Sequence, residues 1–173
     1  MPVSRMEDMR IETPKDLETL AGAVLALVPE QDGRAAVLAL HGELGVGKTA
    51  FTQALARTLG VSEVVPSPTF VVMRLYQIPE HPRFRQLVHI DAYRIGDENE
   101  AAVIGLAALL NDPTNLICIE WPDKIKTYIP EDALHMEFSF AHVYGDGDIR
   151  HVVYGYKNKV EEPHEGVERE IDM

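Results

Sequence analysis

The sequence contains one cysteine in 173 residues, so no disulfide can form within the chain. Cys118 lies in the run N-L-I-C-I-E, which is typical of a buried strand, and we expect it to be a core thiol. No apolar run is long enough to span a bilayer, and the start of the sequence lacks the pattern of a secretion signal. These absences predict a protein of the reducing cytoplasm that has no membrane partner.

Positive charge is scarce. The chain has 16 Lys and Arg residues against 28 Asp and Glu residues, and its formal net charge is -12. An acidic surface repels the phosphates of nucleic acids, so we do not expect this chain to bind RNA or DNA strongly by itself. The acidic residues 157–173 are predicted to form a flexible tail after a single domain over residues 1–156. The seven histidines show no H-E-x-x-H or paired-cysteine spacing, so no structural zinc is predicted.

Residues 42–49 read G-E-L-G-V-G-K-T and fit the phosphate-binding pattern G-x-x-x-x-G-K-[ST], the P-loop. The glycines let the backbone curl so that successive N–H groups point at phosphate oxygens. Lys48 can then reach the β and γ phosphates of a nucleotide, and the Thr49 hydroxyl can bind the Mg²⁺ that accompanies them. The motif therefore predicts nucleotide binding.

The neighbours of this loop have the required pattern. Residues 35–41 (A-A-V-L-A-L-H) form an apolar run without alternation, which is typical of a strand buried on both faces. After the loop, apolar residues recur at helical spacing up to Gly60, which is suited to a helix C-cap. A strand, a glycine loop and a helix in this order aim a helix N-terminus at an anion. A glycine-rich turn between two core elements is the alternative, but it would not require Lys48 and Thr49.

The rest of the chain predicts a three-layer α/β P-loop NTPase fold with a mixed sheet, parallel in the core and antiparallel at its margins. Residues 1–10 are expected to be a loose start. A helix is predicted to begin at the sequence T-P-K-D (13–16), where Thr13 would be the N-cap. A second helix is predicted over 99–110, and strands over 70–76, 86–90, 115–120, 134–143 and 149–156.

Two acidic residues stand at the ends of predicted strands. Glu120 closes an apolar run and could reach the metal beside the P-loop, although an ordinary solvent-facing acid would fit equally well. Asp91 could orient or deprotonate an attacking water, although it could also simply cap the turn that follows its strand. Trp121 is either a core ring or a wall of the nucleotide site, and the local pattern favours the core.

Four more motifs follow the P-loop, and in their order and approximate spacing the chain resembles the TsaE family, also called YjeE. These are small bacterial P-loop ATPases that support the synthesis of threonylcarbamoyladenosine in tRNA. The resemblance is strong over residues 13–122 and weak in the C-terminal hairpin. The four motifs are S-P-T-F (67–70), H-I-D-A-Y-R (89–94), I-G-L (104–106) and I-C-I-E-W-P (117–122).

The resemblance implies an activity and partners. Proteins of this family act with TsaB and TsaD, and their own ATP hydrolysis is slow. TsaD transfers the threonylcarbamoyl group to the adenosine next to the anticodon, so tRNA would be met only through the complex. The implied cofactors are ATP and Mg²⁺.

The resemblance also implies roles for single residues. Lys48, Asp91 and Thr69 would serve catalysis: Lys48 by holding the phosphates, Asp91 as the acid or water-positioning group, and Thr69 by sensing the γ phosphate. Thr49 and Glu120 would hold Mg²⁺. The implied nucleotide contacts are Thr13, Glu43, Leu44, Gly45, Val46, Gly47, Lys48, Thr49, Ala50 and Trp121.

Two departures and two alternatives remain. The family loop usually reads G-D-L-G-A-G-K-T, so Glu43 and Val46 differ here, and the β-branched Val46 could alter the fit around phosphate. A P-loop small-molecule kinase and a nucleotide-dependent binding module with negligible hydrolysis are the other functions that the pattern allows. The guanine-reading segment N-K-x-D is absent, which favours ATP over GTP.

Overall fold

The computed structural model describes residues 6–29, 33–66, 71–96, 98–141 and 149–156. They form one seven-stranded sheet in the order β1-β7-β6-β2-β5-β4-β3. The strands β6, β2, β5 and β4 are parallel, whereas the pairs β1–β7, β7–β6 and β4–β3 are antiparallel. This confirms the predicted mixed sheet. The strands are β1 (Glu7–Ile11), β2 (Ala36–His41), β3 (Met73–Gln77), β4 (Gln86–Asp91), β5 (Asn115–Glu120), β6 (Leu134–Phe140) and β7 (Arg150–Tyr156).

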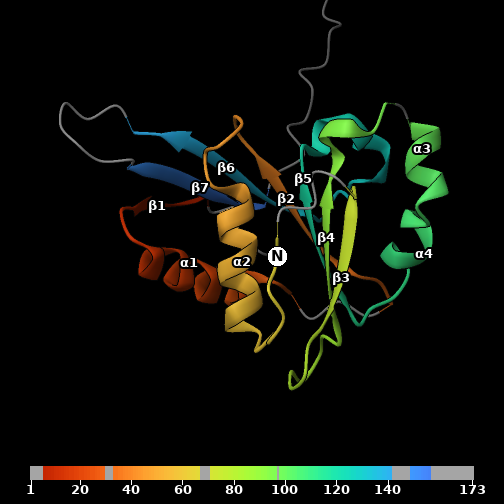
Figure 1. The fold of residues 1–173 in the computed structure, drawn as a ribbon, viewed down its shortest axis with the longest axis horizontal. Helices are drawn as coiled ribbons and strands as arrows, with labels where there is room; N and C mark the ends of the chain where they lie inside the picture. The colour runs from red at the N-terminus through yellow and green to blue at the C-terminus, as the bar shows by residue number, and fades with distance from the viewer. Residues whose placement is uncertain (1–5, 30–32, 67–70, 97, 142–148, 157–173) are drawn as a thin grey trace, which may run out of the picture.

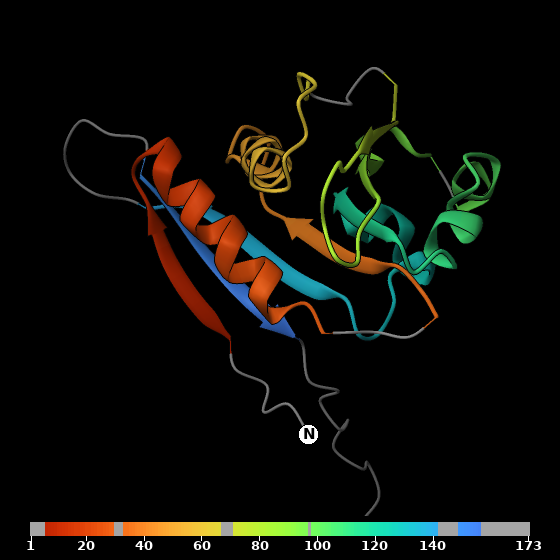
Figure 2. The ribbon, with the colours of Figure 1, turned by 90° about the horizontal axis from the view of Figure 1, so that it is seen from below.

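Helices cover both faces of the sheet (Figures 1 and 2). On one face lie α1 (Pro14–Leu27) and α2 (Lys48–Thr58). On the other lie α3 (Glu98–Val103), α4 (Leu106–Leu110) and the 3₁₀ segment η2 (Pro122–Tyr128). Two buried apolar clusters fill the spaces between these layers.

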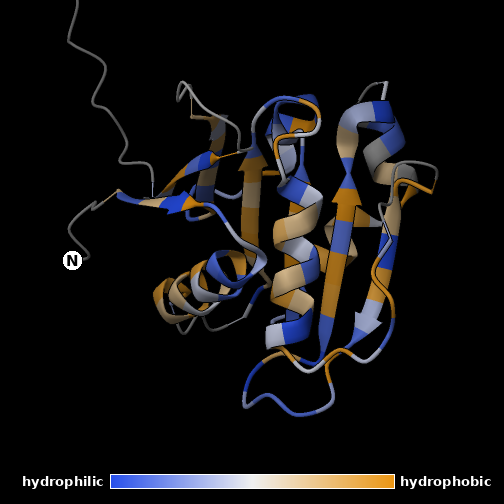
Figure 3. Cartoon of the chain, turned by 60° about the vertical axis from the view of Figure 1, so that its left-hand side comes forward, coloured by the Kyte–Doolittle hydropathy of each residue, from blue (hydrophilic) through white to orange (hydrophobic). Residues whose placement is uncertain are grey.

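The central strands supply both clusters because alternate residues of a strand point to opposite faces. In β2, Leu38 packs in the cluster under α1 and α2, and Val37 packs in the cluster under α4 and η2. In β5, Cys118 and Ile119 divide in the same way, and Cys118 is the buried core thiol that the sequence predicts. Figure 3 shows these hydrophobic strands in the interior of the molecule. A strand buried on both faces has no polar positions, which is why its sequence does not alternate.

The start of α1 is built as predicted. The Thr13 hydroxyl accepts a hydrogen bond from the backbone N–H of Asp16 at 3.3 Å. The Asp16 carboxylate accepts one from the backbone N–H of Thr13 at 2.7 Å. Pro14 occupies the first helical position. This reciprocal capping box satisfies N–H groups that have no partner within the helix.

Two local predictions are wrong. Part of the expected loose start forms β1, which pairs with β7 from Glu7 opposite Tyr154 to Ile11 opposite Arg150. The Tyr154 hydroxyl also donates to the Glu7 carboxylate at 3.1 Å. The single helix expected over 99–110 is divided into α3 and α4, because Gly105 takes a left-handed conformation with φ of 74°.

Other boundaries differ by a few residues. β3 begins at Met73, whereas Phe70, the expected start of that strand, lies outside the described residues. Residues 142–143 of the strand predicted over 134–143 and the tail predicted over 157–173 also lie outside them. The strands predicted before and after residues 78–85 form the antiparallel pair β3 and β4.

The sheet brings the ends of three parallel strands together. Leu40, near the end of β2, pairs with Glu120 at the end of β5, and Asp91 at the end of β4 pairs with the same Glu120. The glycine loop follows β2 at this edge. In sheets of this kind, ligands bind at the carboxyl ends of the strands.

Candidate functional site

The glycine loop joins β2 to α2 and depends on backbone conformations that glycine adopts easily. Gly42, Gly45 and Gly47 have φ values of 135°, 78° and 114°. A Cβ atom at Gly42 would lie 2.5 Å from the carbonyl oxygen of Phe138, so no side chain fits there. α2 begins directly after the loop at Lys48, so its free N-terminal N–H groups face the loop. The structure therefore forms the strand, loop and helix that the sequence predicts.

Lys48 is held at this loop and is only 3% exposed. Its Nζ donates to the carbonyl oxygens of Gly42 at 2.7 Å and Glu43 at 2.8 Å. It also lies 4.3 Å from the centroid of the Trp121 ring. Burial lowers the pKa of Lys48, and the nearby carboxylates of Glu120 and Asp91 oppose that shift. A buried ammonium beside the loop is a strong attraction for a phosphate group.

Glu120 is not the solvent-facing acid that the sequence left open, because it is 5% exposed. Its Oε1 accepts a hydrogen bond from the Thr49 hydroxyl at 2.7 Å. Hydroxyl and carboxylate oxygens are ligands that Mg²⁺ prefers, and Mg²⁺ usually takes only one or two protein ligands together with phosphate oxygens and water. Thr49 and Glu120 therefore fit a magnesium ion that arrives with a nucleotide.

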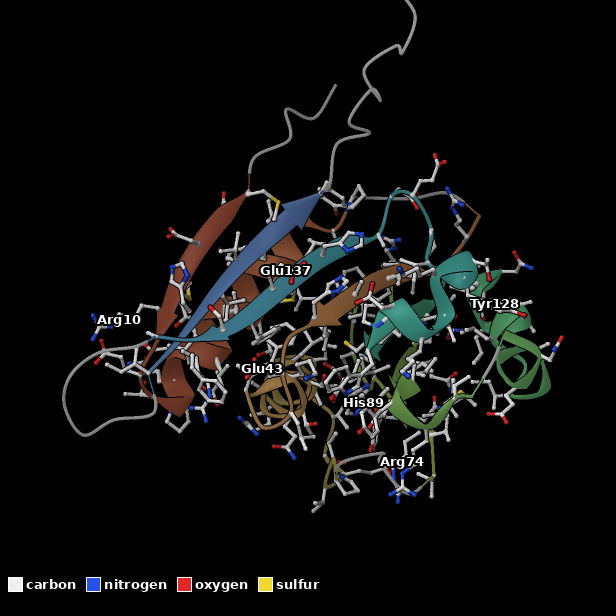
Figure 4. The ribbon with its side chains drawn as sticks, turned by 90° about the horizontal axis from the view of Figure 1, so that it is seen from above. Arg10, Glu43, Arg74, His89, Tyr128 and Glu137 are labelled. Atoms are coloured by element: carbon white, nitrogen blue, oxygen red, sulfur yellow. The ribbon has the colours of Figure 1, made fainter. Side chains whose placement is uncertain are left out.

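His89 is a residue of this site that the sequence reasoning missed. It belongs to β4, is fully buried, and its Nε2 lies 2.8 Å from the same Oε1 of Glu120. Figure 4 shows it among the interior side chains. Its position in the motif H-I-D-A-Y-R, two residues before Asp91 on a strand, was the available signal, because residues i and i+2 share a face.

Asp91 combines both interpretations that its sequence allowed. Its Oδ1 accepts the backbone N–H of Tyr93 at 3.0 Å, so it caps the turn after β4. It is also 5% exposed and lines the cleft described next. The Oδ1 atom holds the turn, and the residue also borders the space where a ligand or water would bind.

Trp121 has an unusual backbone. Its φ of 57° and ψ of 49° are left-handed, which is rare for a bulky residue and occurs where surrounding structure imposes it. This turn places the indole 5.1 Å from the ring of Tyr93 and against the apolar cluster beneath α4 and η2. The ring is thus both part of the core packing and a wall of the site.

A cleft of about 420 Å³ collects these groups. Of the predicted residues, its lining includes Lys48, Thr49, Asp91, Glu120 and Trp121, together with Leu44, Gly45 and Gly47 of the loop. Tyr93 and Arg94 also line it and were not predicted. The cleft is large enough for the phosphate end of a nucleotide.

Thr13 and Ala50 lie elsewhere, in a second hollow of about 230 Å³. That hollow shares Gly47 with the first, so the two meet at the glycine loop. Arg150, which was not predicted, also lines it, and a Cβ atom at Gly47 would lie 3.2 Å from the Arg150 side chain.

Two more of the predicted site residues, Val46 and Glu43, do not line either hollow. Val46 is fully buried and packs in the cluster under α1 and α2, so its extra methyl groups point into the core rather than at the phosphate position. Glu43 is exposed, and its contribution to the site is its backbone carbonyl, which Lys48 binds. Thr69 lies outside the described residues.

The fold and the geometry of this site place the chain in the class of P-loop NTPase folds. YdiB of Bacillus subtilis, a solved structure, has a similar fold with a TM-score of 0.66 and 24% identity, covering 90% of this chain and 88% of that one. The family model described as threonylcarbamoyl adenosine biosynthesis protein TsaE matches residues 11–146. The chain belongs to the TsaE family, a family of tRNA threonylcarbamoyladenosine biosynthesis.

Individual relatives agree with this assignment. The TsaE protein of Bacillus subtilis is 34% identical over 131 residues, which is 76% of this chain and 77% of that protein. The TsaE protein of Streptomyces coelicolor is 38% identical over 114 residues, which is 65% of this chain and 74% of the relative. In the described part of the chain, no helix is both long and apolar enough to cross a membrane.

Proposed function

We propose that this protein is a Mg²⁺-dependent ATPase that acts with TsaB and TsaD to form threonylcarbamoyladenosine in tRNA. The observation that carries the proposal is the convergence of Lys48, Thr49, Asp91 and Glu120 on one cleft at the glycine loop. A loop that only connected two core elements would have no reason to gather a buried lysine, a hydroxyl and two nearly buried carboxylates.

Each residue has a task in this proposal. Lys48 leaves the carbonyls of Gly42 and Glu43 and binds the β and γ phosphates. Thr49 and Glu120 would hold Mg²⁺, which would neutralise phosphate charge in the cleft. Asp91 orients the attacking water, and because the transition state of phosphoryl transfer is loose, position matters more than basicity. Thr69, by resemblance to the family, senses the γ phosphate.

The nucleoside would extend into the second hollow. In a P-loop the N–H groups at the start of the helix face the phosphates, so Ala50 lies on the side toward the α phosphate. Gly47 lines both hollows. A nucleotide whose phosphates pass around Gly47 would therefore extend from the cleft into the second hollow. Thr13 would then contact the nucleoside, in agreement with its implied role.

The remaining expectations are part of the same proposal. TsaD carries out the transfer, so this chain would meet tRNA only through the complex, which agrees with its formal net charge of -12. We place the protein in the cytoplasm, with residues 1–156 as one domain and residues 157–173 as a flexible acidic tail.

The test is ATP hydrolysis by the pure protein, alone and then with its cognate TsaB and TsaD. We expect slow release of phosphate alone and stimulation by the pair, with the Lys48→Ala variant inactive in both settings. Hydrolysis that the pair leaves unchanged would contradict the proposed accessory role. A phosphorylated small molecule formed from ATP would instead identify a kinase.

A further inference from the structure

We propose that His89 is a positioning residue that holds the Glu120 carboxylate ready for Mg²⁺. The inference rests on the proposed function, because it assigns a role at the same metal site. It concerns a residue that does not line the cleft and does not touch the nucleotide in the mechanism above.

The sheet places His89 behind Glu120. β4 and β5 are parallel, with His89 opposite Cys118 and Asp91 opposite Glu120. Cys118 belongs to the cluster under α1 and α2, so His89 lies on the face of the sheet that α2 covers. From there its Nε2 reaches Oε1 of Glu120 at 2.8 Å, while the Thr49 hydroxyl of α2 reaches the same oxygen at 2.7 Å.

Burial determines which ring nitrogen of His89 carries the proton. The ring is fully buried, and its Nδ1 has no hydrogen-bond partner among the described residues. A proton on Nδ1 would therefore be a buried donor without an acceptor, which is costly. The neutral tautomer with hydrogen on Nε2 donates that hydrogen to Oε1 of Glu120, and the unpaired atom is then only an acceptor at Nδ1. With hydrogen on Nδ1 alone, the lone pair of Nε2 would instead face the carboxylate oxygen at 2.8 Å.

Two donors on Oε1 have a consequence for Glu120. They fix the side chain and leave the second carboxylate oxygen, Oε2, for the metal or its water. As a metal ligand Thr49 would have to turn its oxygen toward Mg²⁺, so its hydrogen bond to Glu120 would change with metal binding. His89 is not a metal ligand, so its hydrogen bond to Glu120 can stay the same with and without the metal. Groups that hydrogen-bond to metal ligands commonly change metal affinity by about 10–100-fold when they are removed.

A histidine that only fills space in the core would behave differently. It would affect stability, and an apolar or polar replacement that folds would leave metal affinity unchanged. Three variants separate these cases. His89→Gln places an amide donor near the position of Nε2, whereas His89→Asn is too short to reach Glu120, and His89→Met fills the volume without a donor.

The experiment measures metal and nucleotide binding rather than activity. Mn²⁺ serves as the probe, because its paramagnetic resonance signal is lost on binding, in the presence of saturating ADP. Nucleotide affinity without metal is followed by the fluorescence of Trp121, the one tryptophan of the chain. Circular dichroism and thermal melting establish that each variant is folded.

We expect His89→Asn and His89→Met to weaken Mn²⁺ binding by about 10–100-fold, while metal-free ADP affinity stays within about twofold. His89→Gln should stay within about threefold of the wild type in both measurements. Folded Asn and Met variants with wild-type Mn²⁺ affinity would overturn the inference. A wild type that binds no Mn²⁺ with ADP would instead overturn the proposed metal-dependent function.

A second measurement uses only the wild-type protein. Long-range ¹H–¹⁵N correlation spectra of the histidine rings distinguish the two neutral tautomers. For His89 we expect hydrogen on Nε2 and a bare Nδ1. Hydrogen on Nδ1 alone would exclude donation to Glu120 and overturn the inference even if every variant failed to fold.

Discussion

The Thr49 hydroxyl donates a 2.7 Å hydrogen bond to Oε1 of Glu120 and so joins the first turn of α2 to the end of β5. The two residues are 71 positions apart in the sequence. The bond places the hydroxyl and the carboxylate side by side at one wall of the cleft, which is the arrangement that a shared Mg²⁺ ion requires.

Replacing Thr49 should therefore affect metal-dependent binding selectively. In Thr49→Val the shape is kept and the hydroxyl is lost, so we expect the gain in ADP affinity on adding Mg²⁺ to fall by about 10-fold or more. Affinity without Mg²⁺ should change little, and Thr49→Ser should behave as the wild type. Titration of a fluorescent ADP analogue with and without Mg²⁺ measures this. If Mg²⁺ raised the ADP affinity of Thr49→Val as much as that of the wild type, Thr49 would not be a metal ligand.

Lys48 is expected to serve binding rather than stability. Burial lowers its pKa, which means that keeping the ammonium charged in the cleft reduces the stability of the folded protein. Lys48→Met should weaken ATP binding by about 100-fold, because a charge-assisted contact to phosphate is lost. Its melting temperature without nucleotide should equal or exceed that of the wild type. Titration calorimetry measures ATP binding, and scanning calorimetry measures the melting temperature, for the wild type and Lys48→Met. A clear fall in the melting temperature of Lys48→Met would contradict the expectation on stability.

Asp91 is expected to act on hydrolysis. Asp91→Asn keeps an oxygen that can accept the Tyr93 N–H, so the turn after β4 should survive. We expect ATP affinity within about threefold of the wild type and hydrolysis slower by about 100-fold, the usual scale for a positioned acid or base. Phosphate release at saturating ATP, in the presence of TsaB and TsaD, is the measurement. Hydrolysis at the wild-type rate would show that the assigned role is wrong.

Gly42 and Gly45 provide a matched pair for the loop. An alanine at Gly42 would bring its Cβ to 2.5 Å from the Phe138 carbonyl oxygen, whereas nothing lies within 4 Å of the Cβ position at Gly45. Both have positive φ, so Gly45→Ala should cost about 1–2 kcal/mol. Gly42→Ala should cost clearly more, about 3 kcal/mol or above, because strands β2 and β6 must also move apart. Denaturant unfolding compares them, and equal losses would contradict the close approach.

Tyr156 gives a pH dependence of stability. Its hydroxyl donates to the carbonyl oxygen of Leu27 at 2.9 Å, and burial raises its pKa from 10.0 to about 12. Below pH 10 both the folded and unfolded states are protonated, so the stabilisation is fully present. Between about pH 10 and 12 the unfolded state loses its proton first, and stability is lost. The free-energy difference between wild type and Tyr156→Phe, from urea unfolding, should therefore shrink over this range. A free-energy difference that stays constant over this pH range would show that folding does not raise the pKa of the Tyr156 hydroxyl.

Local sequence was enough to predict the glycine loop, the capped start of α1, the strand limits Asn115–Glu120 and the parallel core of the sheet. These features depend on neighbouring residues: glycines that allow positive φ, a threonine that caps a helix, and apolar runs that only a doubly covered strand can carry. The same loop identified Lys48 and Thr49, because their roles follow from their place in a short motif.

Tertiary structure decided the rest. β1 forms only because β7, more than a hundred residues later, offers its edge, and polar alternation at the start of the chain gives no sign of that partner. The sequence allowed Glu120 to be either a residue of the metal site or a solvent-facing acid. Its buried contacts with Thr49 and His89 show that it does not face solvent. Strand register and helix packing bring such side chains together across long distances in the chain. Local propensity determined the elements of this protein, and long-range packing determined which atoms meet in its site.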